Sequence, residues 1–326
     1  MRDCQIRGTL LSIVILCVCA AAAADFGFYL EPTTGFRGTT YSQSGFYPPD
    51  TMGAVGKDHI VELINGRYKV YGKTDGSVQS NLSLDSFWIS AGVTAVQGGN
   101  YAFDPRVVYD PFSERYYASS IDNAGGPNNY LFAVSNATDP TSGWTGFTID
   151  SDSDDTHWAD FETLGFDADG VYLAANMFPI STGSSATSVL AIPKADVLSV
   201  TPTVANHQLW EERDPNTTGY AIQPVVDLTD SGTPARLLSA HNTPAGGFKR
   251  SSITGDIYAP SLDTSGGFIS VPAYGAPPNA AQPGSKADIN TGDDRLSSSV
   301  VLLRGSLWGV QTVAYNGRAA LRWFEI

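Results

Sequence analysis

Two acidic residues, Asp160 and Glu162, lie two positions apart in the segment DFETLGFD, which has the pattern of a β-strand. Side chains at positions i and i+2 of a strand point to the same face, so we expect this pair to lie together. Asp104 opens a similar segment earlier in the chain. Acid–base hydrolysis of a glycosidic bond needs two carboxyl groups flanking that bond. These three residues are therefore our candidate catalytic groups, and the alternative is that they bind backbone groups at the strand ends.

Basic and aromatic residues near these carboxylates predict ligand contacts. Arg106 follows Asp104 closely, and Arg295 follows another acidic pair. A guanidinium group binds a carboxylate through two parallel hydrogen bonds, so the two arginines are candidates for holding an acidic sugar. His157 and Trp158 precede Asp160 and form a candidate polar and aromatic patch for a sugar ring, with structural packing as the alternative.

The acidic run of residues 150–155 is the candidate metal site. Asp150, Asp152 and Asp154 alternate with other residues and supply hard oxygen ligands, which suit calcium. The run is not an EF-hand, because the sixth position lacks glycine and the twelfth is Phe161 rather than glutamate. A solvated loop is the alternative. No other cofactor is indicated, since phosphate-binding loops and Gly-x-Ser-x-Gly elbows do not occur.

The first 24 residues predict a secretory signal peptide. A short basic start is followed by an apolar run and by small residues up to Ala24, which is the usual three-part pattern. The apolar run is short for a bilayer span, so we expect no membrane span in the mature chain. All three cysteines, Cys4, Cys17 and Cys19, fall within this segment. We therefore expect a secreted protein (extracellular, periplasmic or on the cell surface) whose mature chain, residues 25–326, has no disulfide.

The net charge of −14 argues against nucleic acid as a partner. An acidic surface repels phosphate groups, and no cluster of lysine and arginine offsets it. The expected partner is instead an extracellular glycan or protein.

Many short β-patterned runs are separated by turns about every ten residues, and the dipeptide Asn65-Gly66 predicts a tight hairpin. A short helix is expected around Lys194 to Leu198. Five segments begin alike, with a polar residue and a short apolar strand containing small residues such as Gly165. Their first residues are Asp50, Asp104, Asp160, Gln223 and Asp294.

These starts are 54 to 71 residues apart, an interval that four strands and their loops would fill. The repeat predicts one all-β domain: a β-propeller of about five to six four-stranded blades, with a β-sandwich array as the alternative. In a propeller the opening carboxylates, including Asp293, would converge at one mouth of the channel. The chain ends in a predicted strand, so either Phe26 to Tyr29 close the last blade or the reading frame stops short of the closing strand.

The segments PPDTMGAVGKDHIVELING, DPRVVYDPFSERYYAS, DFETLGFDADGVYLAAN and DDRLSSSVVLLRGSLWGVQT resemble a family of secreted bacterial propellers with no settled activity. More loosely, they are similar to sialidase-like and other glycan-active propellers. The resemblance implies a propeller fold and carries no catalytic residue across, since the Ser-x-Asp-x-Gly-x-Thr-Trp boxes of sialidases are missing.

Three functions remain open from the sequence. The first is a propeller that binds a glycan or protein at one mouth of its ring. The second is a glycoside hydrolase, sialidase-like or otherwise based on carboxylates. The third is a structural domain of a cell-envelope protein. A properly spaced pair of carboxyl groups in a cleft distinguishes the second from the others.

Overall fold

A computed structural model describes residues 35–232, 234–240, 246–284 and 286–326. The predicted signal peptide and the segment Phe26 to Tyr29 lie outside these residues. Residues from Phe36 onward form one compact unit. Within the described part of the chain, no helix has the length and apolar character needed to cross a membrane.

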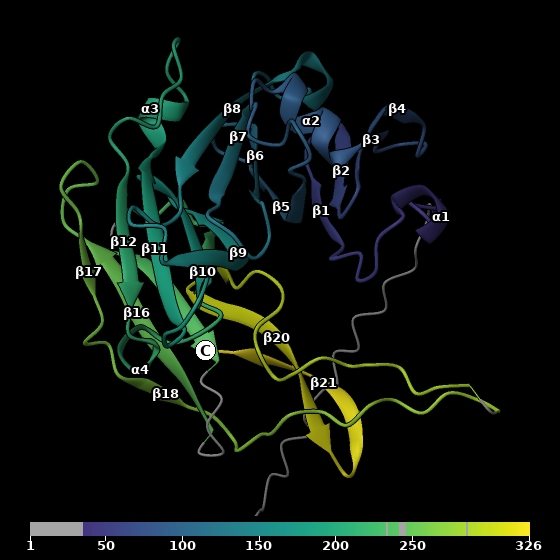
Figure 1. Cartoon of the computed structure of the whole chain (residues 1–326), viewed down its shortest axis with the longest axis vertical. Helices are drawn as coiled ribbons and strands as arrows, with labels where there is room; N and C mark the ends of the chain where they lie inside the picture. The colour runs from purple at the N-terminus through teal and green to yellow at the C-terminus, as the bar shows by residue number, and fades with distance from the viewer. Residues whose placement is uncertain (1–34, 233, 241–245, 285) are drawn as a thin grey trace, which may run out of the picture. The chain divides into compact units, whose positions relative to one another are not determined.

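Three groups of four antiparallel strands follow one another along the chain, each with its strands in sequence order; the first two are separate sheets, and the third is part of an eight-stranded sheet. In each, the short connections join neighbouring strands, which is the construction of a propeller blade (Figure 1). The first contains β1 (Met52–Val55), β2 (His59–Ile64), β3 (Arg67–Gly72) and β4 (Val78–Leu82). The second contains β5 (Ala102–Asp110), β6 (Arg115–Asp122), β7 (Asn129–Ser135) and β8 (Trp144–Asp150). The third contains β9 (His157–Phe166), β10 (Gly170–Pro179), β11 (Ala186–Pro193) and β12 (Gln208–Arg213).

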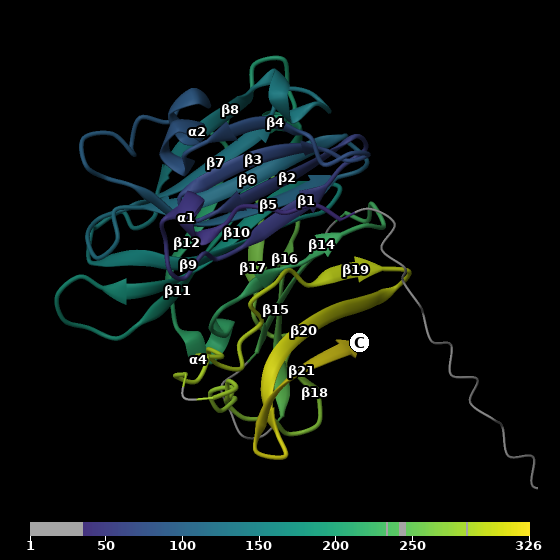
Figure 2. The ribbon, with the colours of Figure 1, turned by 90° about the vertical axis from the view of Figure 1, so that its right-hand side faces the viewer.

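Two further blades complete the described chain. The fourth is made by β13 (Gln223–Pro224), β14 (Val226–Asp227), β15 (Ala235–Ala240), β16 (Gly247–Thr254), β17 (Ser261–Asp263) and β18 (Phe268–Ser270). The fifth is made by β19 (Val301–Leu303), β20 (Ser306–Tyr315) and β21 (Arg318–Glu325) (Figure 2). In the described residues the fifth blade thus has three strands, where the sequence predicts four.

The inner strands of successive blades lie side by side. β1 contacts β5, and β5 contacts β9. β14 then pairs in parallel with both β9 and β19, so the third, fourth and fifth blades share backbone hydrogen bonds at the centre. This arrangement confirms the β-propeller prediction, with a blade number inside the predicted range.

Four buried apolar clusters hold the blades together, one at each of the four successive blade interfaces. Between the second and third blades, for example, Tyr117, Phe132 and Phe166 are fully buried in one cluster. Aromatic and branched side chains of this size bury large apolar areas, which is how a cysteine-free ring gains stability. Among the described residues no such cluster joins the fifth blade to the first, and a cavity opens between these two blades instead.

Short helices and turns connect the strands. The helices are α1 (Tyr41–Ser44), α2 (Leu84–Ser90), η1 (Pro140–Ser142), α3 (Lys194–Val197) and α4 (Pro215–Thr218). α3 confirms the predicted helix. The turn Asn65-Gly66 joins β2 to β3 with Ile64 paired to Arg67, and Gly66 has a φ of 79°, which confirms the predicted hairpin.

Replacing Gly165 by alanine is expected to destabilise the ring. An ideal Cβ at this position would lie 2.4 Å from the carbonyl oxygen of Pro224 on the next inner strand, so the two blades would have to separate. Overpacking of this kind costs about 1–3 kcal/mol. The measurement is the free energy of unfolding in urea. Gly275→Ala is the matched control, because its Cβ would meet no atom within 4 Å. Equal stabilities of the two variants would contradict close approach of the inner strands at Gly165.

Candidate active site at the mouth of the ring

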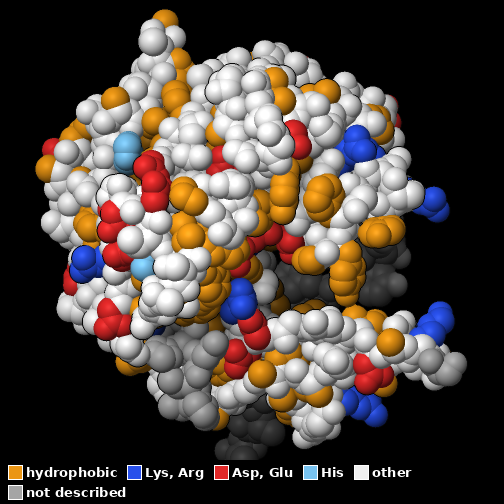
Figure 3. All heavy atoms as spheres, in the orientation of Figure 1, with side chains coloured by type: hydrophobic (Ala, Val, Ile, Leu, Met, Phe, Trp, Pro, Cys, Tyr) orange, Lys and Arg blue, Asp and Glu red, His pale blue; other side chains and the backbone are white. Residues whose placement is uncertain are grey.

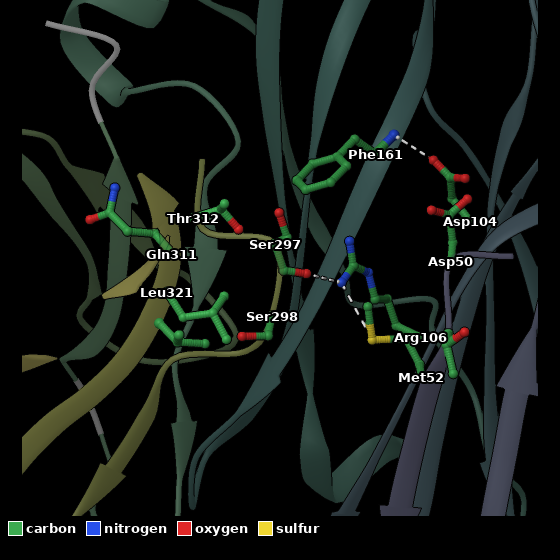
Figure 4. A pocket seen from close by; sticks show the side chains of 12 residues that line it. Asp50, Met52, Asp104, Arg106, Phe161, Ser297, Ser298, Gln311, Thr312 and Leu321 are labelled. Carbon is green, nitrogen blue, oxygen red and sulfur yellow. Dashed lines mark hydrogen bonds between the residues drawn. The ribbon is translucent and has the colours of Figure 1, made fainter. Parts of the chain in front are cut away.

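A cavity of about 420 Å³ opens where the inner strands begin, between the first, second and fifth blades (Figure 4). Asp50 and Asp104 line one side of it, and Ser297 and Leu321 line the other. In the space-filling view, acidic and basic side chains meet at a hollow near the middle of the face (Figure 3).

A repeated backbone kink brings the carboxylates to this mouth. Asp50 lies just before β1, Asp104 within β5 and Phe161 within β9, and each has a left-handed φ, at 40°, 48° and 53°. Such a conformation is costly for residues other than glycine, so it persists where the surrounding structure enforces it. The kink at Phe161 accompanies a shift of register between β9 and β10, and Asp160 directly precedes it.

The carboxyl groups of Asp50, Asp104 and Asp160 form one hydrogen-bonded series. Asp104 stands in the middle, hydrogen-bonded to Asp50 and to Asp160. Asn65 supports the first pair, because its Nδ2 donates to Asp50 at 2.6 Å and its Oδ1 accepts from the backbone N–H of Asp104 at 2.9 Å. The backbone N–H of Phe161 donates to Asp104 at 3.2 Å.

Burial and mutual repulsion keep protons on this series. Desolvation, followed by the charge of Asp104, raises the pKa of Asp50 to about 6. Desolvation and the charge of Asp160 raise the pKa of Asp104, and desolvation raises the pKa of Asp160. Like charges in contact repel one another, so below about pH 6 Asp50 keeps a proton beside Asp104.

Arg106 is buried beside these carboxylates and ties four blades together. From β5, its Nε donates to the carbonyl oxygen of Glu162 in the third blade at 2.8 Å. Its Nη1 donates to the carbonyl oxygen of Ser297 before the fifth blade at 2.9 Å, and it contacts the sulfur of Met52 in the first (Figure 4). The side chain lines the cavity, yet much of its donor capacity is used by the protein itself.

Glu162 lies behind Arg106 and apart from Asp160. The kink at Phe161 separates the two acidic residues, so Asp160 stays half-buried at the mouth while Glu162 is fully buried. Its Oε1 accepts from the hydroxyl of Ser119 at 3.1 Å, and its Oε2 has no hydrogen-bond partner among the described residues. Desolvation raises the pKa of Glu162 well above its usual value.

Phe161 is held between two guanidinium groups at the mouth. Arg106 lies 5.1 Å and Arg295 4.6 Å from the centre of its ring. Arg295 forms a bidentate ion pair with Asp293, and this pairing raises the pKa of the Arg295 guanidinium. Its positive charge also lowers the pKa of Asp160, the opposite direction to burial.

A row of half-exposed aromatic rings leads away from Asp160. The ring of Trp158 lies 5.7 Å from that of Phe178, which lies 6.4 Å from that of Tyr220. The hydroxyl group of Tyr220 lies in the field of Arg295 and Asp160, although burial is the largest cause that raises its pKa. Trp158, a sequence candidate, therefore lies in an aromatic surface connected with the carboxylates.

His157 points to a different place from the carboxylate series. It lines a second hollow with Glu212, and its Nδ1 contacts that carboxylate closely. Its Nε2 lies 3.1 Å from the carbonyl oxygen of Ser184, and its backbone N–H donates to Asp152 at 2.7 Å.

The predicted calcium ligands do not converge as a set of three. Asp150 and Asp154 each accept one backbone hydrogen bond within the loop, whereas Asp152 joins His157 and Glu212, with one ligand atom from each within 4.8 Å of the others. A donor set with an imidazole and two carboxylates suits a transition metal better than calcium. The hydroxyl group of Thr156 lies among these atoms, donating to Glu212 at 2.6 Å.

Sequence reasoning left Asp50, Phe161, Tyr220 and Glu212 outside the set of site residues. The repeat contained the information for the first of these, because Asp50 occupies the same place in its blade as Asp104. No pattern in the neighbouring sequence indicates that Glu212 is a site residue, because it contacts His157 from a strand more than 50 positions later.

Asp50→Asn is expected to stabilise the protein at pH 7 more than at pH 4. Asp50 has its pKa raised from 3.8 to about 6, so the folded chain binds more protons than the unfolded chain in this window. Protonated Asp50 therefore favours the folded state. Its contribution to the free energy of unfolding is complete below the pKa that Asp50 has in the unfolded chain, and it is lost as the pH rises through about 6. An asparagine amide donates to Asp104 at any pH. Partial solvent exposure reduces the expected gain at pH 7 to about 1 kcal/mol.

Urea unfolding of wild type and Asp50→Asn at both pH values measures this difference. A gain that is the same at pH 4 and pH 7 would show that Asp50 has an ordinary pKa.

Comparisons with known proteins come from solved structures. No protein-family model matches the sequence, and no curated protein matches it. The fold is similar to a GH43 endo-arabinanase from Bacillus licheniformis, with 16% identity, coverage of 85% of this chain and 93% of that chain, and a TM-score of 0.40.

It is also similar to native arabinanase Arb43A of Bacillus subtilis, with 17% identity, 85% and 93% coverage and a TM-score of 0.43. A subtype N11 neuraminidase-like protein of A/flat-faced bat has 10% identity, 84% and 70% coverage and a TM-score of 0.40. A likeness of this degree does not bear on activity.

Proposed function

We propose that this protein is an exported glycoside hydrolase that uses the carboxyl groups at the mouth of the ring. The observation that carries the proposal is the series Asp50, Asp104 and Asp160, in which Asp50 has a pKa of about 6 at the edge of an open cavity. Export follows from the predicted signal peptide. Arabinanases are among the similar solved structures, and the proposal does not depend on them.

The roles follow from the environments of the three groups. Asp50 keeps its proton up to about pH 6 and lines the cavity, so it is the general acid that protonates the leaving oxygen. Asp160 lies near the positive charge of Arg295 and accepts from Asp104, so it is the carboxylate that acts as base or nucleophile. Asp104 maintains the proton on Asp50.

The order of the three groups is consistent with the same roles. Asp104 is hydrogen-bonded to both neighbours and stands between Asp50 and Asp160. Acid and partner carboxylates of glycosidases are about 5 Å apart in retaining enzymes and about 6.5–9.5 Å apart in inverting enzymes. Because Asp104 stands between them, Asp50 and Asp160 are the pair that we propose to flank the bond.

The aromatic row of Trp158, Phe178 and Tyr220 supplies a surface on which sugar rings can pack. The mouth carries more acidic than basic side chains, and Arg106 and Arg295 already have partners. This favours a neutral glycan over an acidic one.

A panel of polysaccharides tests the proposal. The purified full-length mature chain is incubated with neutral arabinans, xylans and galactans and with sialylated or uronate-containing glycans, and the products are identified by mass spectrometry. Release of oligosaccharides from a neutral polymer is the expected result. A folded sample that releases nothing from any polymer, but binds one, would replace hydrolysis with glycan binding.

A further inference from the structure

The interface between the fourth and fifth blades is only partly filled. On the inward half, Leu238 and Phe248 pack against Leu302 in a buried cluster. On the outward half a cavity of about 750 Å³ remains between β15 and β16 on one side and β19 and β20 on the other. This volume is within the range of small-molecule sites.

Two arginine side chains face this cavity. Arg236 precedes Leu238 by two positions on β15, so both point to the same interface. Arg250 is the cross-strand partner of Leu238 on β16 and also lines the cavity. In a chain with 19 basic and 33 acidic residues, two guanidinium groups at one cavity concentrate positive charge where the surroundings are mostly negative.

Neither arginine has its charge satisfied by the protein. Across residues 35–232, 234–240, 246–284 and 286–326, no hydrogen bond or ion pair engages Arg236, and it is half-buried. Arg250 donates to the carbonyl oxygen of Gly266 through Nε and Nη2, at 3.1 and 2.8 Å, and makes no ion pair with any residue that the structure describes. Asp263 also lines the cavity, but its carboxylate accepts from the backbone N–H of Ser265.

The remaining wall contains the hydroxyl-bearing residues Thr229, Ser231, Ser251 and Ser252 and a group of apolar side chains. Leu302 and Leu307 from the fifth blade and Ile269 from the fourth line the same cavity, and Leu307 and Ile269 remain partly exposed there. A charged group that loses solvent without a partner is costly, and an exposed apolar wall gains from being covered. A single ligand with an anionic end and an apolar body would satisfy both.

We propose that this cavity binds an amphiphilic carboxylate, with its anionic end on Arg236 and Arg250 and its hydrocarbon part against Leu302 and Leu307. The guanidinium of Arg236 receives the carboxylate through two parallel hydrogen bonds. The site is separate from the carboxylates at the mouth, so it does not depend on the function proposed above.

Calorimetric titration of the full mature chain with decanoate, below its micelle-forming concentration, tests this site. Saturable binding at one site per chain is expected. Decyltrimethylammonium, which has the same tail and a positive head, is expected not to compete. Acetate, which has the head without the tail, is expected to bind far more weakly.

Two variants locate the binding. Arg236→Gln is expected to weaken decanoate binding about ten- to a hundredfold, as the loss of a charge-assisted contact implies. Ser252→Glu places a carboxylate on the cross-strand partner of Arg236 and is expected to weaken binding to a similar extent by occupying the guanidinium. Arg318→Gln, at the far end of the β20–β21 hairpin, is the control and is expected to bind normally.

The proposal is overturned if folded wild type shows no saturable binding or if the cationic analogue binds equally well. It is also overturned if both Arg236→Gln and Ser252→Glu retain wild-type affinity. Ser252→Glu keeps the test decisive if Arg236→Gln does not fold.

Discussion

Hydrolysis of a glycan by the Asp160→Asn protein is expected to be about 10²–10⁴-fold slower than by wild type. Asparagine fills the same volume and still accepts from Asp104, so the mouth keeps its shape. It has no negative charge to act as base or nucleophile, and it does not complement the positive charge that develops on the sugar in the transition state. The effect should therefore fall on kcat, with KM nearly unchanged.

Asp154→Asn is the matched control for this substitution. It makes the same chemical change on an exposed loop, where the carboxylate accepts a backbone hydrogen bond from Thr156. Its initial rates should equal those of wild type. A rate for Asp160→Asn within about threefold of wild type, with the control unchanged, would remove Asp160 from the chemical step.

Arg106→Met is expected to lower the free energy of unfolding by about 3–5 kcal/mol, as breaking a buried charged arrangement does. The substitution removes hydrogen bonds to the carbonyl oxygens of Glu162, in the third blade, and Ser297, in the segment before the fifth. It also removes the positive charge that lowers the pKa of the buried Glu162. Urea unfolding followed by circular dichroism measures the loss.

Two comparisons separate the ring contact from a general effect of losing an arginine. Arg322→Met removes a guanidinium that donates to Pro272 and Gln311 within the outer part of the ring, and about 1 kcal/mol is expected. Adding Glu162→Gln to Arg106→Met should recover part of the loss, because the buried group can no longer ionise. Equal losses for Arg106→Met and Arg322→Met would contradict a central role for Arg106.

Local patterns allowed much of the fold to be predicted. Asn65-Gly66 determines a two-residue hairpin by itself, and the five similar segments became the five inner strands, with the small side chain of Gly165 at a close approach of backbones. Such features depend on a few consecutive residues, so they can be read before any long-range contact is known. The three-stranded fifth blade could not be predicted, because strand pairing across a blade depends on partners elsewhere in the chain.

The candidate site could be predicted only in part, because some of its features follow from the local repeat and others depend on distant segments. The repeat indicated that Asp104 and Asp160 would approach one another, and they do. Strand alternation placed Glu162 beside Asp160, but the left-handed conformation of Phe161 separates the two, and a kink of this kind is not encoded by a glycine. Arg106 was predicted to contact a ligand, whereas the structure shows it bonded to carbonyl oxygens from segments 56 and 191 positions away.

The pH dependence of kcat/KM tests the central claim most directly, because it reports the ionisation of the free protein. If Asp50 donates the proton, the rate of product release from the best polysaccharide should fall as the pH rises through about 6, the pKa that burial and Asp104 give it. The Asp50→Asn protein should be slower and should lack this fall. A wild-type rate that rises through pH 6, or an identical fall in Asp50→Asn, would contradict the assignment of Asp50 as the acid.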